Sequence, residues 1–327
     1  MHVGALGDIY AGVSSELEQV SQHLSSTLWN CFAALGDGTY GTDMLRGKLL
    51  RPALCLMSGK LFRDDVSDLI DLATACELVH VATLIHDDVV DCAAVRRGVP
   101  SVNARWDEKS AVLSGDRIVC EGLLLLTAYR SIGAAEHMLH TLKRVINGEM
   151  KQLHSDRRLD ENMCIEVARE KTGSLISAVC RLPAMWYGTD EHDVAALGQF
   201  GEHFGIAFQI VDDLLDLTGE ESVLGKTPLS DVRNGKQTLP IVYLYDMMHE
   251  DRAISDRLQE PRGGEFIQGD DAGWLSELIR ESGSAGRALD KASQHVARAK
   301  RSLDVFPESP AKDALLSLSD FVLGRNC

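Results

Sequence analysis

Apolar residues recur along most of the chain at spacings of three and four, which is the period of one face of an α-helix. Alternation of apolar and polar residues, which is typical of a half-buried strand, is sparse. The pattern therefore predicts an all-α protein. Helices are expected over residues 67–91, 110–130, 134–153, 161–187, 193–217 and 275–304.

Proline and glycine indicate where these helices are interrupted. After Pro52 the next prolines are Pro100 and Pro183, so long helices can run between them. A last helix is expected after Ser309, which can cap it, with Pro310 in the first turn, where a missing N–H costs nothing. Breaks rich in turn residues are expected over residues 36–43, 92–100, 218–240 and 260–273.

The length of 327 residues permits two domains but does not require them, and we expect residues 1–327 to form a single domain. With 49 acidic against 33 basic residues, the net charge of −16 argues against non-specific binding of nucleic acid or of an anionic membrane. An anionic substrate would need metal ions or clustered basic residues.

Cysteine usage and apolar runs bear on the compartment. The eight cysteines are scattered without a C-x-x-C pair, as expected of reduced thiols in a cytoplasmic protein. The first residues lack the features of a secretion signal. Apolar stretches such as residues 122–128 are far shorter than the ~20 residues that span a bilayer, so no transmembrane segment is expected.

The segment "GDGTYG" at residues 36–41 matches the G-x-G-x-x-G pattern of dinucleotide-binding sites. Such a site needs a strand before the glycines and a parallel sheet around them. The residues before it follow a helical pattern, so we interpret this segment as a loop.

A more informative segment is "LIHDDVVDCAAVRRG" at residues 84–98. The spacing places Asp87 and Asp91 one turn apart on the same helix face, where two like charges destabilise a helix unless something neutralises them. A single D-D-x-x-D is usually a solvated helix end. The apolar run before it favours instead oxygen ligands for Mg²⁺, and from this motif alone the two interpretations remain about equal.

The second copy, "FQIVDDLLDLTG" at residues 208–219, changes this balance. Two helices that each end in D-D-x-x-D could face each other across a bundle and hold several Mg²⁺ ions with one polyphosphate group. Nearby basic residues would supply counter-charge. We therefore expect the aspartates and arginines of the first motif to converge on phosphate, and not chiefly to pair with each other.

A competing metal site uses His80, His86 and Asp87, which imitate the H…HD…D set of metal-dependent phosphohydrolases. His80 and His86 are six residues apart on one helix and do not share a face. That interpretation also leaves the second aspartate motif unexplained.

Several segments between residues 44 and 245 resemble, in order, those of the trans-isoprenyl diphosphate synthases, also called polyprenyl synthetases. They are "GKLLRPAL", "ELVHVATLIHDDVVD", "REKTGSLISAVC", "FGIAFQIVDDLLD" and "GKTPLSDVRNGKQTLPIVY". The resemblance implies a prenyltransferase with an isoprenoid synthase-type bundle of about ten or more helices around a deep central cavity, commonly a homodimer. It also implies about three Mg²⁺ ions and two substrates, isopentenyl diphosphate and an allylic diphosphate.

The resemblance also implies roles for individual residues. The expected metal ligands are Asp87, Asp88, Asp91, Asp212 and Asp216, with Asp213 completing the second motif. The expected contacts of the allylic diphosphate are Arg96, Lys171, Thr172, Gln209, Lys226 and Lys236. The expected pocket for isopentenyl diphosphate contains Lys48, Arg51, His80 and Arg97.

The aspartates of the first motif, together with Lys171, Asp212 and Lys226, are expected to act in catalysis. Two departures stand out. Arg46 and Leu49 replace a glycine and a basic residue, from which we expect altered affinity. Leu229 replaces a common glycine, from which we expect a change in how that segment closes.

Product length is expected to depend on Ala82 and Thr83, the fifth and fourth residues before Asp87. Ala82 would lie ~7.5 Å along the helix from the metal site, where a bulky aromatic would block a growing chain. Its small side chain favours a long product of about C30 to C50. If alanine serves only helix packing, a C15 to C20 product remains the alternative. A class I terpene cyclase or an inactive partner subunit is disfavoured, because both aspartate motifs are intact.

Overall fold

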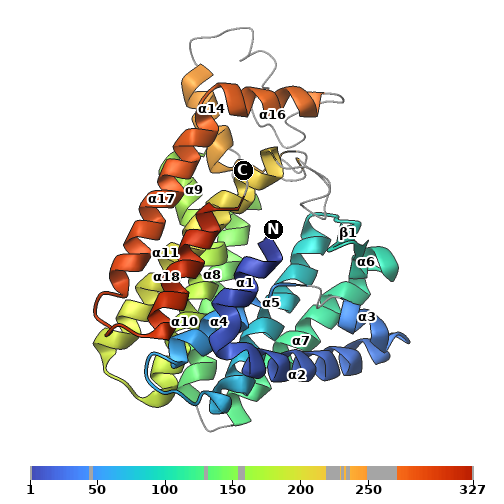
Figure 1. The fold of residues 1–327 in the computed structure, drawn as a ribbon. Helices are drawn as coiled ribbons and strands as arrows, with labels where there is room; N and C mark the ends of the chain where they lie inside the picture. Colours follow the sequence, from blue (N-terminus) through green and yellow to red (C-terminus); the bar gives the residue numbers. More distant parts are fainter. Residues whose placement is uncertain are drawn as a thin grey trace. The chain divides into compact units, whose positions relative to one another are not determined.

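The structure is a computed structural model, and it describes residues 2–43, 47–128, 132–153, 159–218, 229, 232, 236–248 and 271–325. Figure 1 shows that helices dominate these residues. The helices are α1 (His2–Tyr10), α2 (Ser14–Ala33), α3 (Gly38–Asp43), α4 (Leu50–Gly59), α5 (Ile70–Val90), α6 (Val102–Arg105), α7 (Glu108–Ala128), α8 (Ile132–Leu153), α9 (Glu161–Ala168), α10 (Ser174–Tyr187), α11 (Glu191–Thr218), α14 (Leu239–Met248), α16 (Asp271–Glu281), α17 (Ser284–Ser302) and α18 (Pro310–Leu323). Short helices η1 (Ala11–Val13) and η2 (Ser67–Leu69) and the π-helix η3 (Arg169–Gly173) complete them.

Within the described residues the sheet is a single hairpin of β1 (Val95–Arg96) and β2 (Val99–Pro100). The all-α prediction is therefore confirmed. The expected cap of α18 is also present, since the Ser309 hydroxyl accepts a hydrogen bond from the N–H of Lys312 at 3.3 Å.

Three sequence-based expectations need correction. Residues 161–187 form α9, η3 and α10 and not one regular helix. Residues 275–304 are split by Gly283, whose φ of +83° ends α16 in a conformation that glycine adopts at no steric cost. The segment expected to be a loop at residues 36–41 enters the short helix α3 from Gly38 onward.

The chain divides into two compact units, each assembled from three stretches. The first contains Met1–His140, Ala178–Gly198 and Leu303–Leu318, and the second contains Thr141–Ser177, Gln199–Ser302 and Ser319–Cys327. Neither unit is one continuous part of the chain. The single domain expected over residues 1–327 stays a prediction.

In the first unit, α5 is the central helix. Its residues from Leu72 to Ala82 are buried, and α7 lies beside it in Figure 1. The two backbones approach closely at Gly122 of α7, because a Cβ there would come within 3.2 Å of the carbonyl oxygen of Ala75. Such burial holds the aspartates at the end of α5 on a rigid element.

By length and composition, one described helical segment, Ser67–Val90, would suffice to cross a membrane, with a hydropathy of 1.4. The expectation that the chain has no transmembrane segment rested on shorter apolar runs such as residues 122–128 and did not take this segment into account. Of its most apolar window, 72% is buried inside the protein, as in a core helix.

The second unit has its own core, in which the last turns of α11 pack with α14 and α16. The buried members are Leu214, Leu217, Leu229, Val232, Ile241, Leu244, Leu275 and Ile279. Earlier in α11, glycine permits a close backbone approach: a Cβ on Gly205 would lie 2.7 Å from the Cα of Gly173 in η3. This contact sets η3 directly against α11.

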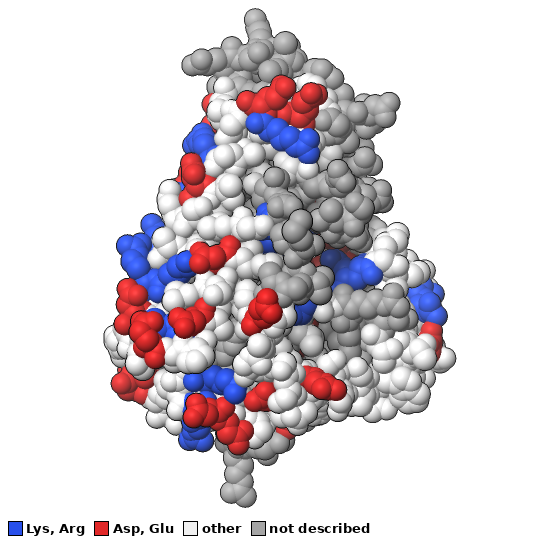
Figure 2. Space-filling view, viewed as in Figure 1, with Lys and Arg blue, Asp and Glu red and all other residues white. Residues whose placement is uncertain are grey.

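Charged side chains of both signs lie next to one another along the left side of the view in Figure 2. On this face, Lys and Arg offset part of the acidic excess locally. The seven described cysteines form no disulfide, in agreement with the predicted free thiols.

Candidate active site

The first aspartate motif lies at the carboxyl end of α5. Asp87 and Asp88 are in its last turn and Asp91 is its C-cap. The Asp88 side chain is 1% exposed, whereas Asp87 and Asp91 are only half-buried. The three carboxylates are therefore not equivalent.

Asp88 is held by Arg96 of β1. Nε of Arg96 donates a hydrogen bond to Oδ1 of Asp88 at 2.8 Å, and Nη2 makes a second contact with the same oxygen. Burial raises the pKa of Asp88, although Arg96 acts in the opposite direction. The expectation that the opposite charges of this segment do not chiefly pair is wrong for these two residues.

The β1–β2 hairpin brings Arg96 back to α5. Its turn uses two residues at positive φ, Arg97 at +52° and Gly98 at +79°. Arg96 lies opposite Val99 in the two-stranded register. The loop before it is held by Asn103, which donates from Nδ2 to the carbonyl of Ala93 at 3.0 Å.

Three of the residues expected to bind isopentenyl diphosphate, Arg51, His80 and Arg97, interact through their charges. A Cβ on Gly47 would lie 2.8 Å from Nη1 of Arg97, so the "GKLLRP" segment runs against that guanidinium. The pKa of His80 is well below its usual value because of burial and of the charges of Arg51 and Arg97. His80 is therefore neutral at pH 7, so one ring nitrogen can donate a hydrogen bond and the other can accept one. Lys48, the residue after Gly47, is exposed.

Sequence reasoning missed Glu77 in this group. It is 4% exposed, burial raises its pKa, and the charges of Arg51 and Arg97 lower it in part. Its signal in the sequence was a carboxylate within an apolar run, three residues before His80 and hence on the same face of α5.

The competing histidine site is not assembled. His80 is buried beside arginine charges, whereas His86 contacts α7, with Nε2 3.4 Å from Oδ1 of Asp116. Gly115 of α7 makes this possible, since a Cβ there would collide with the His86 ring. The two histidines thus have separate surroundings.

The second aspartate motif lies in the last turns of α11. Gln209 donates from Nε2 to Oδ1 of Asp213 at 2.7 Å, and its Oε1 accepts a hydrogen bond from the Thr172 hydroxyl at 2.5 Å. Asp216, expected to be a metal ligand, is fully buried, and its carbonyl accepts a hydrogen bond from the N–H of Leu229 at 2.9 Å. Asp212 and Asp213 are both half-buried, and the Asp212 side chain is 41% exposed.

A pocket in the second unit gathers several of the predicted residues. Its polar lining includes Gln152, Lys171, Gln209, Asp213 and Lys236. Lys171, Gln209 and Lys236 are three of the residues expected to contact the allylic diphosphate, and Thr172 joins them through Gln209. The lining contains Asp213, which completes the second motif, and does not contain Asp216, which was expected to be a metal ligand. Lys226 and Arg46 lie outside the described residues.

Lys171 lies in the π-helix η3 and forms an ion pair with the largely buried Glu149 of α8. Its Nζ also lies 3.5 Å from Oε1 of Gln152. Gly148 lets α8 approach, because a Cβ there would be 2.8 Å from the N–H nitrogen of Lys171. One extra residue in a helical turn re-aims the side chains that follow, which is why π-helices often mark functional sites.

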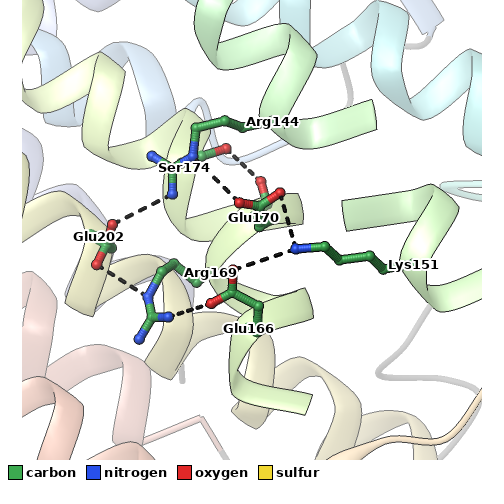
Figure 3. A network of polar contacts seen from close by, with 7 residues as sticks. All are labelled: Arg144, Lys151, Glu166, Arg169, Glu170, Ser174 and Glu202. Carbon is green, nitrogen blue, oxygen red and sulfur yellow. Dashed lines mark hydrogen bonds and ion pairs between the residues drawn. The ribbon is translucent and has the colours of Figure 1, made fainter. Parts of the chain in front are cut away.

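A network of polar contacts surrounds η3 (Figure 3). Glu202 of α11 lies 3.3 Å from Nε of Arg169 and 3.7 Å from Nη2 of Arg144. Glu170 lies 3.8 Å from Nε of Arg144 and 3.7 Å from Nζ of Lys151. These pairs join α8 and α11 to η3 and fix the turn that carries Lys171. Sequence reasoning missed this network, because the pairing depends on which helices meet.

The carboxylates fit a hard divalent cation, since Mg²⁺ prefers oxygen ligands and Asp87, Asp91, Asp212 and Asp213 supply them from accessible helix ends. A further set of close ligand atoms, in Asp190, His192 and Asp193, lies at the start of α11. There Asp190 accepts a hydrogen bond from the N–H of Asp193 at 2.9 Å, which is an ordinary helix cap.

The polyprenyl synthetase family model matches residues 39–265. A nonaprenyl diphosphate synthase of Mycobacterium tuberculosis is 33% identical over 98% of this chain and 96% of its own length. Component 2 of a heptaprenyl diphosphate synthase of Geobacillus stearothermophilus is 30% identical over 97% of this chain and 98% of its own length. A short chain isoprenyl diphosphate synthase of Methanothermobacter thermautotrophicus is 35% identical over 85% and 86%.

Solved structures show the same similarity. The crystal structure of a decaprenyl diphosphate synthase from Rhodobacter capsulatus has a TM-score of 0.85 and 29% identity, covering 98% of this chain and 99% of that one. A polyprenyl synthase from Caulobacter crescentus, complexed with calcium and isoprenyl diphosphate, has a TM-score of 0.84 and 29% identity, covering 99% and 98%.

Proposed function

The chain belongs to the polyprenyl synthetase family and is a prenyltransferase, and we propose that it condenses isopentenyl diphosphate with an allylic diphosphate to give a long-chain trans-polyprenyl diphosphate. The observation that carries the proposal is the pocket that brings Lys171, Gln209 and Lys236 together beside Asp213. Fixed cations and a carboxylate in one pocket suit a diphosphate with its metal ion.

In this proposal Asp87 and Asp91 are metal ligands. Asp88 instead forms an ion pair with Arg96 and does not bind a metal ion. In the second motif, Asp212 is a metal ligand as expected, and Asp213 replaces the buried Asp216 as the second ligand. Mg²⁺ bound at these carboxylates would stabilise the negative charge that grows on the diphosphate as the allylic C–O bond breaks. About three ions would serve both motifs.

Basic side chains of the chain also stabilise the charge on the diphosphates. The ion pair with Glu149 holds Lys171 in place in η3. Lys171 therefore needs no large reorganisation when negative charge develops on the diphosphate. Thr172 fixes the Gln209 amide, which leaves Gln209 one orientation toward Asp213. Arg51, Arg97 and the neutral His80 bind the second diphosphate. The double bond of isopentenyl diphosphate attacks the allylic carbon, and a proton leaves to the released diphosphate.

Product length follows from Ala82. It is fully buried on α5, and the Thr83 hydroxyl after it donates to the carbonyl of His80 at 2.8 Å and so turns back to its own helix. Neither side chain is a bulky obstacle. The matched relatives carry names of both long-chain and short-chain synthases. The small Ala82 supports a product of about C30 to C50 for this chain.

We further propose a cytoplasmic homodimer. Four side chains of α8, each more than half exposed, share one face of the helix: Leu139, Ile146, Met150 and Leu153. Such a stripe is typical of a surface covered by another chain. A copy of the same chain would make it a homodimer, whereas a different subunit would resemble the component arrangement named for one relative. The mass of the purified protein in solution distinguishes the two.

The decisive experiment incubates the purified protein with isopentenyl diphosphate, allylic primers from C5 to C20 and Mg²⁺, and sizes the dephosphorylated products by chromatography. We expect long polyprenyl chains. Asp87→Ala should abolish them, and Asp304→Ala, which changes an exposed aspartate elsewhere, should not. No elongation with any primer would contradict the proposed function.

A further inference from the structure

Arg325, which follows the end of α18, contacts the second aspartate motif. Its Nη1 lies 2.5 Å from Oδ1 of Asp212, within hydrogen-bonding distance. The centre of its guanidinium lies 4.9 Å from the centre of the Phe208 ring. Phe208 and Asp212 are one turn apart on α11, so the guanidinium is held by an aromatic face and a carboxylate on the same side of that helix.

This contact is partly shielded from water. The Arg325 side chain is 21% exposed and the Asp212 side chain 41% exposed. A charge pair in such a position is screened less than one on the open surface. The Phe208 ring beside the guanidinium also restricts the Arg325 side chain, so less side-chain entropy opposes the pairing. Asp213, the neighbouring carboxylate, instead accepts a hydrogen bond from the neutral amide of Gln209.

We propose that Arg325 is a further residue of the second aspartate site, where it pairs with Asp212 and makes cation binding there depend on diphosphate. This rests on the proposed function, in which Asp212 is a metal ligand. A divalent cation at Asp212 meets a fixed positive charge at the same carboxylate, and the two repel each other. Diphosphate brings negative charges that offset this repulsion. Arg325 therefore disfavours loading of Asp212 by the metal alone and permits loading together with diphosphate.

The test measures binding of Mn²⁺ alone, from the electron paramagnetic resonance signal of the free ion, to the full-length protein. Arg325→Met removes the charge but keeps an apolar side chain against Phe208. We expect it to bind Mn²⁺ about fivefold more tightly than the wild type, the size of effect that a partly exposed charge exerts. Arg325→Lys should retain the wild-type affinity. With saturating inorganic diphosphate present, the difference between Arg325→Met and the wild type should largely disappear.

The matched control is Arg301→Met, which removes an exposed positive charge on α17 and should leave Mn²⁺ binding unchanged. Arg325→Gln provides a second neutral variant if Arg325→Met does not fold. Unchanged or weaker Mn²⁺ binding by the neutral variants would overturn the inference.

Asp212→Asn separates this inference from the function on which it rests. If Asp212→Asn leaves Mn²⁺ binding at the wild-type level, the metal role of Asp212 fails and the inference fails with it. If Asp212→Asn weakens binding but Arg325→Met does not strengthen it, only the role of Arg325 is refuted.

Discussion

Asp88 and Arg96 form an ion pair in which the carboxylate is almost completely buried and Nε of Arg96 donates to Oδ1 at 2.8 Å. The pair joins the end of α5 to the β1–β2 hairpin. An arginine that sequence similarity assigns to phosphate is thus also a structural partner of the aspartate motif.

Removing Arg96 alone should destabilise the protein strongly. Arg96→Met leaves the buried Asp88 carboxylate without its charge partner, so we expect a loss of about 3 kcal/mol in the free energy of unfolding. In the double variant Arg96→Met with Asp88→Asn no buried charge remains, and part of the loss should be recovered. Urea unfolding of the four proteins measures the coupling. Losses that simply add would show that the two residues do not interact.

Thr172→Val should impair binding of the allylic substrate. The variant loses the hydroxyl that orients Gln209, so the amide can rotate away from Asp213. We expect KM for the allylic diphosphate to rise about tenfold while KM for isopentenyl diphosphate changes little, as for a lost charge-assisted contact. Steady-state kinetics with each substrate varied in turn checks this.

The control for that variant is Thr74→Val, which replaces another buried threonine whose hydroxyl donates to its own helix at Ile70. It should leave both KM values near those of the wild type. Equal rises in both KM values for Thr172→Val would argue for general disruption and against a role of Thr172 in orienting Gln209.

Ala82→Tyr should shorten the product toward C15 to C20. Ala82 is fully buried one and a half turns before Asp87, so a tyrosine ring there would narrow the space along α5. Chromatography of the dephosphorylated products measures chain length, and thermal unfolding verifies that the variant is folded. A folded, active variant with unchanged product length would remove Ala82 as the determinant.

At Leu229, substitution by glycine should destabilise the protein less than substitution by alanine. It has φ of +61° although it is a leucine, and its side chain is buried among Leu214, Leu217 and Ile241. The left-handed conformation costs about 1–2 kcal/mol for a residue with a Cβ. Leu229→Ala removes most of the buried side chain but keeps the cost of the left-handed conformation. Leu229→Gly removes the buried side chain and also removes that conformational cost.

We therefore expect both variants to be less stable than the wild type, with Leu229→Ala less stable than Leu229→Gly by about 1 kcal/mol. Urea unfolding measures the order. Alanine equal to or better than glycine would mean that the positive φ carries no cost at this position.

The histidine pair between α11 and α17 should make stability depend on pH. Nδ1 of His203 lies 3.1 Å from Nδ1 of His295. Burial, His203 and the charge of Arg298 lower the pKa of His295 to about 4. The unfolded histidine titrates near pH 6.5, so below that pH the unfolded state binds the proton more readily, and stability falls as the pH is lowered toward 4.

His295→Gln should therefore show a shallower loss of stability between pH 6.5 and 4, by about 1.4 kcal/mol per pH unit relative to the wild type. Thermal unfolding across this range measures it. His140→Gln, at a largely exposed histidine, is the control and should follow the wild-type curve. Parallel curves for His295→Gln and the wild type would contradict the assignment.

The helices and the two aspartate motifs were predictable from the sequence because both are local features. Apolar spacing follows the helical period, and D-D-x-x-D places carboxylates on one turn whatever surrounds them. The family resemblance rested on such local segments, and it correctly indicated an all-α prenyltransferase. It also named Lys171, Gln209 and Lys236, which the structure brings together in one pocket.

Tertiary contacts decided which charges meet. Asp88 pairs with Arg96 because a hairpin folds back onto α5, and Arg325 reaches Asp212 although the two are 113 residues apart in the chain. The π-turn at Lys171 exists where Gly205 and Gly148 let two helices approach η3. Burial of Asp216 and accessibility of Asp212 likewise depend on packing around α11. Spacing alone makes the aspartates of a motif look alike, whereas desolvation and the nearest cation depend on elements that lie far away in the sequence.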